Sequence, residues 1–292
     1  MAARRIVAPA CASGRALAQC VGPAANIYVN FSLGLEAVRE IVERTIGEAG
    51  LASVARDQIA LGLGLAGLSN AADAFRVTTA LPGWARVEAV NDAVTACIGA
   101  SGLAEGGLII AGTGSAGVAR VRGTTTIIGG RGFLLGDDGA GARIGADALR
   151  AALRAHDGLE PMTGLSRALL AHFKFDPLAM IRWALDAKPS DYGAFAPRVF
   201  EAARGGEAGA KDIVETAARA IAALVRALVA LGTENVALVG GVAEPLREYL
   251  PKDIAERLHA PRHDAVDGAI LLVGGSVLDA AGSGRVRHKA SQ

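Results

Sequence analysis

The sequence predicts an α/β fold, because short apolar runs typical of strands alternate with longer segments of helical periodicity. The strand-like runs gather in the first half of the chain, and large helices dominate the second half. Gly-rich turns follow several of the strand-like runs, and in open α/β sheets ligands bind at the carboxyl ends of strands. These observations favour two α/β lobes, with extra helices inserted into the second.

The first half of the chain is expected to hold most of the strands. The predicted strands are Arg4–Ala8, Arg15–Val21, Gln58–Gly67, Arg86–Val90 and Leu108–Ala111, and the predicted helices are Gly34–Ala49, Ala71–Thr79 and Asn91–Ala100. The first two strands are expected to pair as a hairpin. The helix at Gly34–Ala49 has its apolar residues on one face and Gly50 as its stop signal. In Gln58–Gly67 leucine alternates with glycine, which fits a strand that another backbone approaches closely.

The second half is expected to be mostly helical. The predicted helices are Ala142–His156, Thr163–Phe173, Pro177–Ala187, Asp191–Ala203, Glu207–Leu231, Ala243–Leu250 and Asp267–Leu278. One strand, Asn235–Val239, is expected between them and leads into Gly240-Gly241. We expect residues 1–102 to form the first lobe, residues 103–275 the second, and a helix within 276–292 to return to the first.

Bulk composition narrows the class of protein. With 292 residues, of which 51% are hydrophobic, the chain can bury one large core or two ordinary ones. The formal net charge of +1 favours neither a nucleic acid nor an anionic membrane as a partner. The three cysteines and five histidines form no CxxC or HExxH pattern, so we expect no structural zinc and a cytoplasmic location. Neither a signal peptide nor a membrane-spanning helix is expected.

Asp92 is the first candidate for chemistry. It follows a predicted strand and begins a predicted helix, so its carboxylate is expected at the carboxyl edge of a sheet. A carboxylate there can accept the proton of a hydroxyl that attacks a γ-phosphate. The alternative is that Asp92, or Asn91 before it, does no more than cap the helix.

The turn Gly112-Thr113-Gly114-Ser115 is the second candidate, because it follows the short apolar run at Leu108–Ala111. A Gly-Thr-Gly turn exposes backbone N–H groups and a hydroxyl, which are the donors that a phosphate needs. The chain contains no GxxxxGK[ST] motif, so P-loop chemistry is not supported. The alternative for this turn is an ordinary tight β-hairpin.

The next Gly-rich segments predict a site for a polyol. Gly130 lends permissive backbone, Arg131 donates in a fork, and Asp137 accepts hydrogen bonds from hydroxyl groups. The alternative is an internal ion pair of Arg131 with Asp137 or Asp138 that shapes the loop. The ion pair and the polyol site are compatible with each other.

Two weaker candidates complete the set. Gly240-Gly241 follows a predicted strand, and such a turn lets adenine or ribose approach the backbone, although a lone Gly-Gly turn is usually only a turn. Asn26 lies in a loop before the first long helix, where its amide suits a sugar hydroxyl or the turn itself.

The order of these motifs resembles that of the sugar kinases of the actin and heat-shock-chaperone ATPase superfamily, in the branch of N-acetylglucosamine kinases and BadF/BadG-type ATPases. Within that branch the sequence is most similar to bacterial glucosamine kinases. The residues that carry the resemblance are Ala24-Ala-Asn-Ile27, Leu63-Gly-Leu-Ala-Gly67, Asn91-Asp-Ala93, Ile110-Ala-Gly-Thr-Gly-Ser115, Ile128-Gly-Gly-Arg-Gly-Phe133, Gly136-Asp-Asp-Gly-Ala-Gly141, Asp191-Tyr-Gly-Ala-Phe195 and His263-Asp-Ala-Val-Asp-Gly-Ala269. Arg131 favours the glucosamine branch, because N-acetylglucosamine kinases carry Trp there.

The resemblance implies a two-lobed actin-like (ribonuclease-H-like) fold and phosphorylation of D-glucosamine at its 6-hydroxyl, with ATP and Mg²⁺. It implies Asp92 as the general base. The implied sugar contacts are Asn26, Asp92, Gly130, Arg131 and Asp137, and the implied nucleotide contacts are Gly112, Thr113, Gly114, Ser115, Gly240 and Gly241. It names no protein ligand for a metal, and it leaves a homodimer open, because related kinases are often dimers.

The sequence departs from the family pattern at its start. The superfamily opens with a central strand and an Asp-Gly-Gly-Gly-Thr hairpin, whose Asp helps to hold Mg²⁺, and this sequence has neither. Met1–Cys20 instead resembles the second and third strands of the first sheet. We therefore expect two strands in the first lobe to lack the neighbour that would lie between them.

Three alternatives to a glucosamine kinase follow. One is a kinase for N-acetylglucosamine or another hexose. Another is a catalytically weak or dead sugar- or nucleotide-binding protein, because a lone phosphate hairpin orients ATP poorly. The last is an ATPase that activates a reductase, which the cysteines disfavour because they lack the spacing of an iron–sulfur ligand set.

Overall fold

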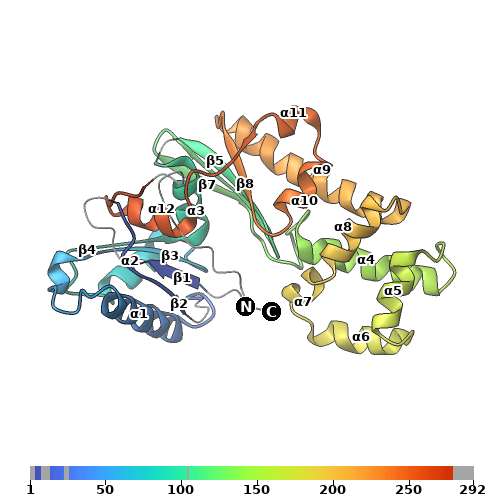
Figure 1. Cartoon of the computed structure of the whole chain (residues 1–292), viewed down its shortest axis with the longest axis horizontal. Coiled ribbons are helices and arrows are strands. Elements are labelled where there is room, and N and C mark those ends of the chain that lie inside the picture. Colours follow the sequence, from blue (N-terminus) through green and yellow to red (C-terminus); the bar gives the residue numbers. More distant parts are fainter. Residues whose placement is uncertain (1–3, 8–13, 23–25, 104, 279–292) are drawn as a thin grey trace. The chain divides into compact units, whose positions relative to one another are not determined.

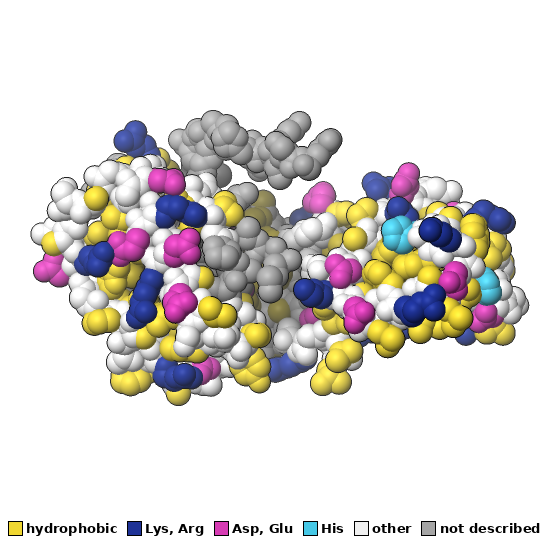
Figure 2. All heavy atoms as spheres, turned by 90° about the horizontal axis from the view of Figure 1, so that it is seen from below, with side chains coloured by type: hydrophobic (Ala, Val, Ile, Leu, Met, Phe, Trp, Pro, Cys, Tyr) yellow, Lys and Arg dark blue, Asp and Glu magenta, His cyan; other side chains and the backbone are white. Residues whose placement is uncertain are grey.

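The computed structural model describes residues 4–7, 14–22, 26–103 and 105–278 (Figure 1). The chain divides into two compact units, the first made of residues 1–104 and 261–292 and the second of residues 105–260. On the face drawn in Figure 2, acidic and basic side chains are interspersed on each unit. No helix among the described residues is long and apolar enough to cross a membrane.

The described part of the first unit is built from two pairs of strands and the helices that pack on them. The strands are β1 (Arg4–Val7), β2 (Gln19–Gly22), β3 (Ala60–Leu65) and β4 (Arg86–Asn91), and the helices are α1 (Phe31–Glu48), α2 (Ala71–Thr79), α3 (Asp92–Ser101) and α12 (Ala265–Leu272), with a 3₁₀ turn at Arg56–Gln58. β1 and β2 are antiparallel, which confirms the predicted hairpin, although its turn lies outside the described residues. β3 and β4 are parallel. Among the described residues these two pairs are separate sheets.

The core of the first unit forms on the leucine face of β3. Leu61, Leu63 and Leu65 are buried with Val38 and Val42 of α1. The alternation of leucine and glycine in β3 therefore has the meaning expected from the sequence, since the leucines face the core and the glycines face a close neighbour.

That close neighbour is a pair of helices, α3 and α12, which lie far apart in the sequence. A Cβ atom on Gly62 of β3 would stand 1.8 Å from the carbonyl oxygen of Ala269 in α12. A Cβ atom on Gly268 of α12 would stand 1.9 Å from the carbonyl oxygen of Thr95 in α3. Glycine at these two positions lets the backbones of β3, α12 and α3 approach closely.

The unit boundaries differ from those set from the sequence, at 102 and 275. Since α12 packs on α3 and β3, the C-terminal part of the chain joins the first unit from residue 261 onward. The helix expected within 276–292 lies almost wholly outside the described residues, and the described residues 276–278 are not helical.

The second unit is centred on a mixed five-stranded sheet. Its strands, in the order β7-β6-β5-β8-β9, are β7 (Thr124–Gly129), β6 (Ser115–Val121), β5 (Gly106–Ala111), β8 (Val236–Val239) and β9 (Leu258–His259). β5 is antiparallel to β6 and parallel to β8, and β6 is antiparallel to β7. The carboxyl ends of β5, β7 and β8 therefore reach the same edge of the sheet.

Helices make up the rest of the second unit. They are α4 (Gly141–His156), α5 (Gly164–His172), α6 (Pro177–Asp186), α7 (Pro189–Gly193), α8 (Ala196–Arg204), α9 (Ala208–Ala230), α10 (Ala243–Arg247) and α11 (Lys252–Ala255). The long helix α9 lies on β5, β6 and β7, and its Ile221 and Leu228 are buried with Ile109 and Ala119 of the sheet. The strands expected from the sequence are present, whereas β6, β7 and β9 were not predicted.

Several predicted helices have different bounds in the structure, and three of them end early or are divided. Asp191–Ala203 is divided into α7 and α8 because Pro197, which has no N–H group, stands in the first turn of α8. The helix predicted to reach Leu278 ends at Leu272, where Gly274 takes a left-handed conformation with φ of +84°. The helix predicted from Ala243 to Leu250 ends at Arg247.

Gly47→Ala is expected to stabilise the protein by about 0.5–1 kcal/mol. Gly47 is exposed near the end of α1, and a Cβ atom there would have no heavy atom within 4 Å. Alanine loses less backbone entropy than glycine when a helix forms. Gly50→Ala, three residues on, is the control and should lower stability, because Gly50 has φ of +70°. Thermal unfolding of the two variants checks this, and an equal effect of both would contradict it.

Candidate active site

One group of candidate residues lies at the carboxyl ends of β3 and β4 in the first unit. The parallel register pairs Leu65 of β3 with Asn91 of β4, so both strands end at the same level. The Asn91 side chain donates from its amide nitrogen to the carbonyl of Leu68, at 3.0 Å. This hydrogen bond joins the end of β4 to the segment that follows β3. Asp92 follows at once as the first residue of α3.

Asn91, rather than Asp92, is the N-cap of α3. Its Oδ1 accepts the backbone N–H of Ala93 at 3.0 Å, and the same N–H lies 3.1 Å from Oδ1 of Asp92. The half-buried Asp92 thus stands in the first helical turn, where the helix dipole favours a negative charge. Since Asn91 caps the helix, Asp92 is not needed as the cap. Its role as a general base stays a prediction.

Asn26 lies beside the same strand ends. Residues Asn26 and Ala66 form an isolated parallel bridge, and Oδ1 of Asn26 accepts the backbone N–H groups of Tyr28 at 2.9 Å and Val29 at 3.3 Å. A Cβ atom on Gly67 would stand 2.4 Å from that Oδ1. This oxygen therefore stabilises the turn at Asn26–Val29. A sugar contact by Asn26 would be made by its amide nitrogen.

A second group of candidate residues lies at the carboxyl ends of β5, β7 and β8 in the second unit. The turn at Gly112–Ser115 joins β5 to β6, so it is a β-hairpin, with the N–H of Gly112 donating to Gly114 at 2.9 Å. The carbonyls of Gly112 and Thr113 accept the N–H groups of Gly141 and Ala142, at 2.8 and 3.2 Å. The positive end of the α4 dipole thus lies directly behind the turn, which favours an anion there.

The turn after β8 packs on the same strand end. The N–H of Val242 donates to the carbonyl of Ala111 at 3.1 Å. Gly240 has φ of +114°, and a Cβ atom on it would stand 2.2 Å from the same carbonyl oxygen. The Gly112–Ser115 turn and Gly240–Gly241 are therefore neighbours, as a site for a nucleotide and its phosphates requires.

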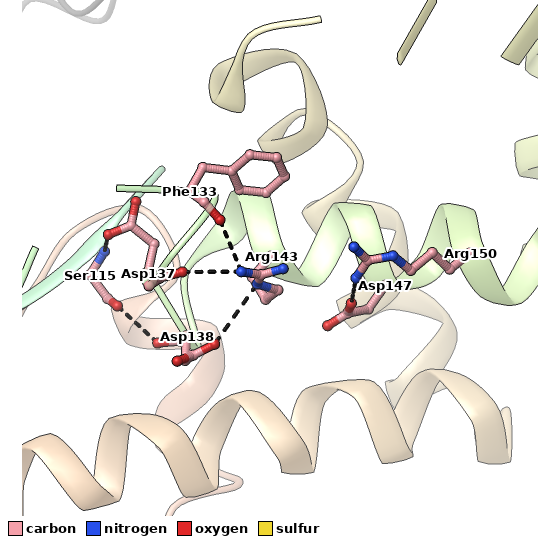
Figure 3. Close-up of polar contacts among 8 residues, drawn as sticks. Ser115, Phe133, Asp137, Asp138, Arg143, Asp147 and Arg150 are labelled. Atoms are coloured by element: carbon pink, nitrogen blue, oxygen red, sulfur yellow. Dashed lines mark hydrogen bonds and ion pairs between the residues drawn. The ribbon is translucent and has the colours of Figure 1, made fainter. Parts of the chain in front are cut away.

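Asp137 ties the loop at Gly129–Asp138, here called the Gly-rich loop, to the Gly112–Ser115 turn (Figure 3). Its Oδ1 accepts the N–H of Ser115 at 3.2 Å, and the Ser115 hydroxyl donates to the carbonyl of Asp138 at 2.8 Å. Burial raises the pKa of Asp137 above its usual 3.8, and the Asp138 charge adds to this, while the Ser115 N–H and the Arg143 charge act in the opposite direction.

The cation that pairs with this loop is Arg143 of α4, which was not predicted from the sequence. The sequence offered Arg131 as an ion-pair partner for Asp137 or Asp138, and this alternative is wrong for the described residues. Arg131 is exposed, whereas Nε of Arg143 lies 3.8 Å from Oδ1 of Asp138. The available signal was a cation in the first turn of a helix whose buried residues are otherwise apolar.

Asp137→Asn is expected to gain stability relative to the wild type as the pH rises. A carboxyl whose pKa is raised in the folded state favours folding in its protonated form, and that contribution is lost as the pH rises from about 4 through the folded pKa. Asparagine stays neutral and tolerates the φ of +60° at this position. Urea unfolding at several pH values, with the exposed Asp212→Asn as control, measures the difference. Parallel curves for the two variants would contradict it.

The described residues contain no group of three or more His, Cys, Asp or Glu side chains that could hold a metal ion. Mg²⁺ is commonly held by one or two carboxylates together with the phosphates of its nucleotide. In the second unit Asp137 already accepts a hydrogen bond from Ser115. The carboxylates of the described chain therefore fit Mg²⁺ only in company with a nucleotide.

One protein-family model and two curated proteins match this chain over about half of its length or more. A model of the BadF/BadG/BcrA/BcrD ATPase family matches residues 12–273. The chain is 31% identical over 250 residues to a glucosamine kinase of Vibrio cholerae, covering 86% of this chain and 85% of that one. It is 37% identical over 145 residues to an N-acetyl-D-glucosamine kinase of Dictyostelium discoideum, covering 48% and 46% of the two chains.

Solved structures give the same fold. A Chromobacterium violaceum protein described as a candidate N-acetylglucosamine kinase superposes with a TM-score of 0.82 at 32% identity, over 92% of this chain and 99% of that one. A ROK hexokinase of Thermus thermophilus superposes with a TM-score of 0.54 at 18% identity, over 92% and 98% of the two chains. These likenesses confirm the predicted α/β fold of the actin-like ATPase type found in sugar kinases.

Proposed function

The chain belongs to the BadF/BadG/BcrA/BcrD ATPase family, and from this membership we propose that it transfers the γ-phosphoryl group of ATP to the 6-hydroxyl of D-glucosamine. The observation that carries the proposal is 31% identity to a glucosamine kinase over 86% of this chain. The position of Asp92 at the end of β4 and the convergence of two Gly turns behind β5 support it.

In the proposed reaction Asp92 acts as the general base. The 6-hydroxyl oxygen attacks the γ-phosphorus, its proton passes to the Asp92 carboxylate, and the bond from the γ-phosphorus to the bridging oxygen of ADP breaks. Positioning and charge stabilisation supply most of the rate in such transfers. Mg²⁺, bound with ATP, would supply charge neutralisation on the phosphates.

In the second unit, the Gly112–Ser115 turn would bind the phosphates of ATP. The Gly112–Ser115 turn is fixed by hydrogen bonds to α4 and to Asp137, so it needs little reorganisation when it meets an anion. The exposed side chain of Thr113 adds a hydroxyl donor. Gly240 and Gly241 would accommodate the adenosine side, because neither has a side chain to stand in the way.

The proposed sugar contacts are Asn26 and Asp92, which lie in the first unit, and Gly130, Arg131 and Asp137, which lie in the second. Arg131, in its exposed position, would contact sugar oxygens and set the preference for glucosamine. A kinase for N-acetylglucosamine is the second candidate. The likeness to the Dictyostelium and Chromobacterium proteins favours it.

A coupled ADP-release assay tests the proposal. Mg²⁺-ATP is supplied with glucosamine, N-acetylglucosamine, glucose or no sugar, and the phosphorylated product is identified by mass spectrometry. Turnover that is fastest with glucosamine is the expected result, and turnover fastest with N-acetylglucosamine supports the second candidate. Saturable sugar binding in calorimetry without any ADP release would replace both kinase proposals by a binding function.

A further inference from the structure

Arg143 occupies an unusual place for a charged side chain. Its neighbours in α4, Ala142, Ile144 and Gly145, are buried, and its own side chain is only 22% exposed. Its Nε is buried and has no hydrogen-bond partner among the described residues, and the 3.8 Å to Asp138 is an ion-pair distance only. Burying a guanidinium costs desolvation free energy unless its other nitrogens make hydrogen bonds or ion pairs.

One terminal nitrogen of Arg143 joins two points of the Gly-rich loop (Figure 3). It donates to the carbonyl of Phe133 at 2.9 Å and to the carbonyl of Gly136 at 3.2 Å. The guanidinium carbon also lies 5.3 Å from the centre of the Phe133 ring, in a cation–π arrangement. The loop between these residues is thereby closed around the arginine.

Side-chain packing at the tip of the Gly-rich loop adds little to its shape. Leu134 and Leu135 at its tip are 88% and 89% exposed, so they add no packing. Its backbone takes left-handed conformations at Gly129, Gly130 and Gly132, with φ of +73°, +65° and +82°. Glycine loses more conformational freedom on ordering than any other residue, so the loop needs external anchors to keep one conformation.

The Gly-rich loop is anchored on both sides of its tip, at Phe133 and at Asp137, and Asp137 is also one of the residues assigned to the sugar. On one side the Phe133 ring packs on Tyr192 at 5.0 Å, and the Tyr192 ring packs on Trp183 at 4.9 Å. On the other side Asp137 accepts the N–H of Ser115 in the Gly112–Ser115 turn. Arg143 is the residue that binds the loop backbone between these two anchors.

We propose that Arg143 is a positioning residue that holds the Gly-rich loop in its sugar-binding conformation through the carbonyls of Phe133 and Gly136. The part that concerns the sugar rests on the proposed function, because it takes Arg131 and Asp137 as sugar contacts. The part that concerns the loop rests on the contacts of Arg143 alone.

The test compares Arg143→Gln with Arg150→Gln. Arg150 lies seven residues further along α4, is 63% exposed and pairs with Asp147 at 2.7 Å, so its loss removes one charge from the same helix without touching the loop (Figure 3). Amide hydrogen exchange over residues 130–138 needs no ligand. We expect exchange about tenfold faster in Arg143→Gln and unchanged in Arg150→Gln. Equal exchange in both folded variants overturns the proposal, whatever the activity of the protein.

Kinetics give the second readout. For Arg143→Gln we expect the KM for the sugar to rise about 10–100-fold, the usual effect of removing the support behind a contact residue, with a smaller change in the KM for ATP. Equal changes in both, or in neither, overturn the link to the sugar. If the wild type turns over no sugar at all, the proposed function fails, while hydrogen exchange still decides the role of Arg143.

The pH profile separates positioning from simple stabilisation. The groups that act on Asp137 are the Ser115 N–H, the Asp138 charge and the Arg143 charge. Arg143→Gln should move the acid limb of the sugar KM to higher pH, and Arg143→Lys should keep it, because the charge remains although the fork is lost. If Arg143→Gln does not fold, Arg143→Lys carries the test, and loop exchange equal to wild type in that variant overturns the proposal.

Discussion

Replacing Asp92 by asparagine is expected to lower turnover about 10²–10⁴-fold, the usual contribution of general base catalysis. This corresponds to about 3–5 kcal/mol of lost transition-state stabilisation. Asparagine has nearly the same shape and keeps the Oδ1 atom that faces the N–H of Ala93. The N-cap of α3 belongs to Asn91 and is not altered. The fold and the binding of both substrates should therefore survive while proton transfer is lost.

The measurement is steady-state ADP release together with calorimetric binding of sugar and of a non-hydrolysable ATP analogue. The control is Asp57→Asn, which removes a carboxylate from the exposed turn before β3, at the opposite end of the strand. It should change turnover less than twofold. Near-normal turnover in Asp92→Asn would exclude Asp92 as the base, whereas loss of sugar binding as well would assign it a binding role instead.

Gly240→Ala is expected to lower the free energy of unfolding by about 2–6 kcal/mol and to abolish nucleotide binding. The left-handed φ of +114° strains any L side chain. The added methyl group would also stand 2.2 Å from the carbonyl oxygen of Ala111 and 2.9 Å from the backbone nitrogen of Gly112. Both contacts are with backbone atoms that cannot rotate away. The turn at Gly240–Gly241 would therefore have to move away from the Gly112–Ser115 turn.

Gly241→Ala is the matched control for this prediction. Its Cβ atom would have no heavy atom within 4 Å, and the residue is exposed. It should therefore leave thermal stability within about 0.5 kcal/mol of wild type, as ordinary surface substitutions do. Thermal unfolding with and without ATP measures both effects. Equal stabilities of the two variants would show that the close packing of Gly240 against β5 is not required.

The features predicted from the sequence are those with a local cause. The helix that begins at Asp92 was predicted because Asn91 is a good cap after an apolar strand, and the structure has this cap. The glycines of β3 were predicted to meet another backbone, and Gly62 does meet Ala269. That the partner lies more than 200 residues further along the chain has no local signal.

The missed features depend on tertiary context. β6 was not predicted because Ala116, Gly117 and Ala119 hide the alternation of its two faces, and the strand forms because β5 and β7 pair with it. Arg143 was missed since its partners are backbone carbonyls, which every residue has. The roles of Asn26, Arg131 and Asp137 toward a sugar remain predictions.

The packing of α12 on α3 and β3 has a consequence for the order of folding during synthesis. The second unit is continuous, from residue 105 to residue 260, and all its contacts are available once that stretch has left the ribosome. The first unit is begun earlier and completed later, because α12 is made after the whole second unit. The N-terminal part of the first unit thus reaches its native packing only after α12 is made. Until then Gly62 of β3 lacks the helix that packs against it, and during this period the nascent chain is open to misfolding and to chaperones.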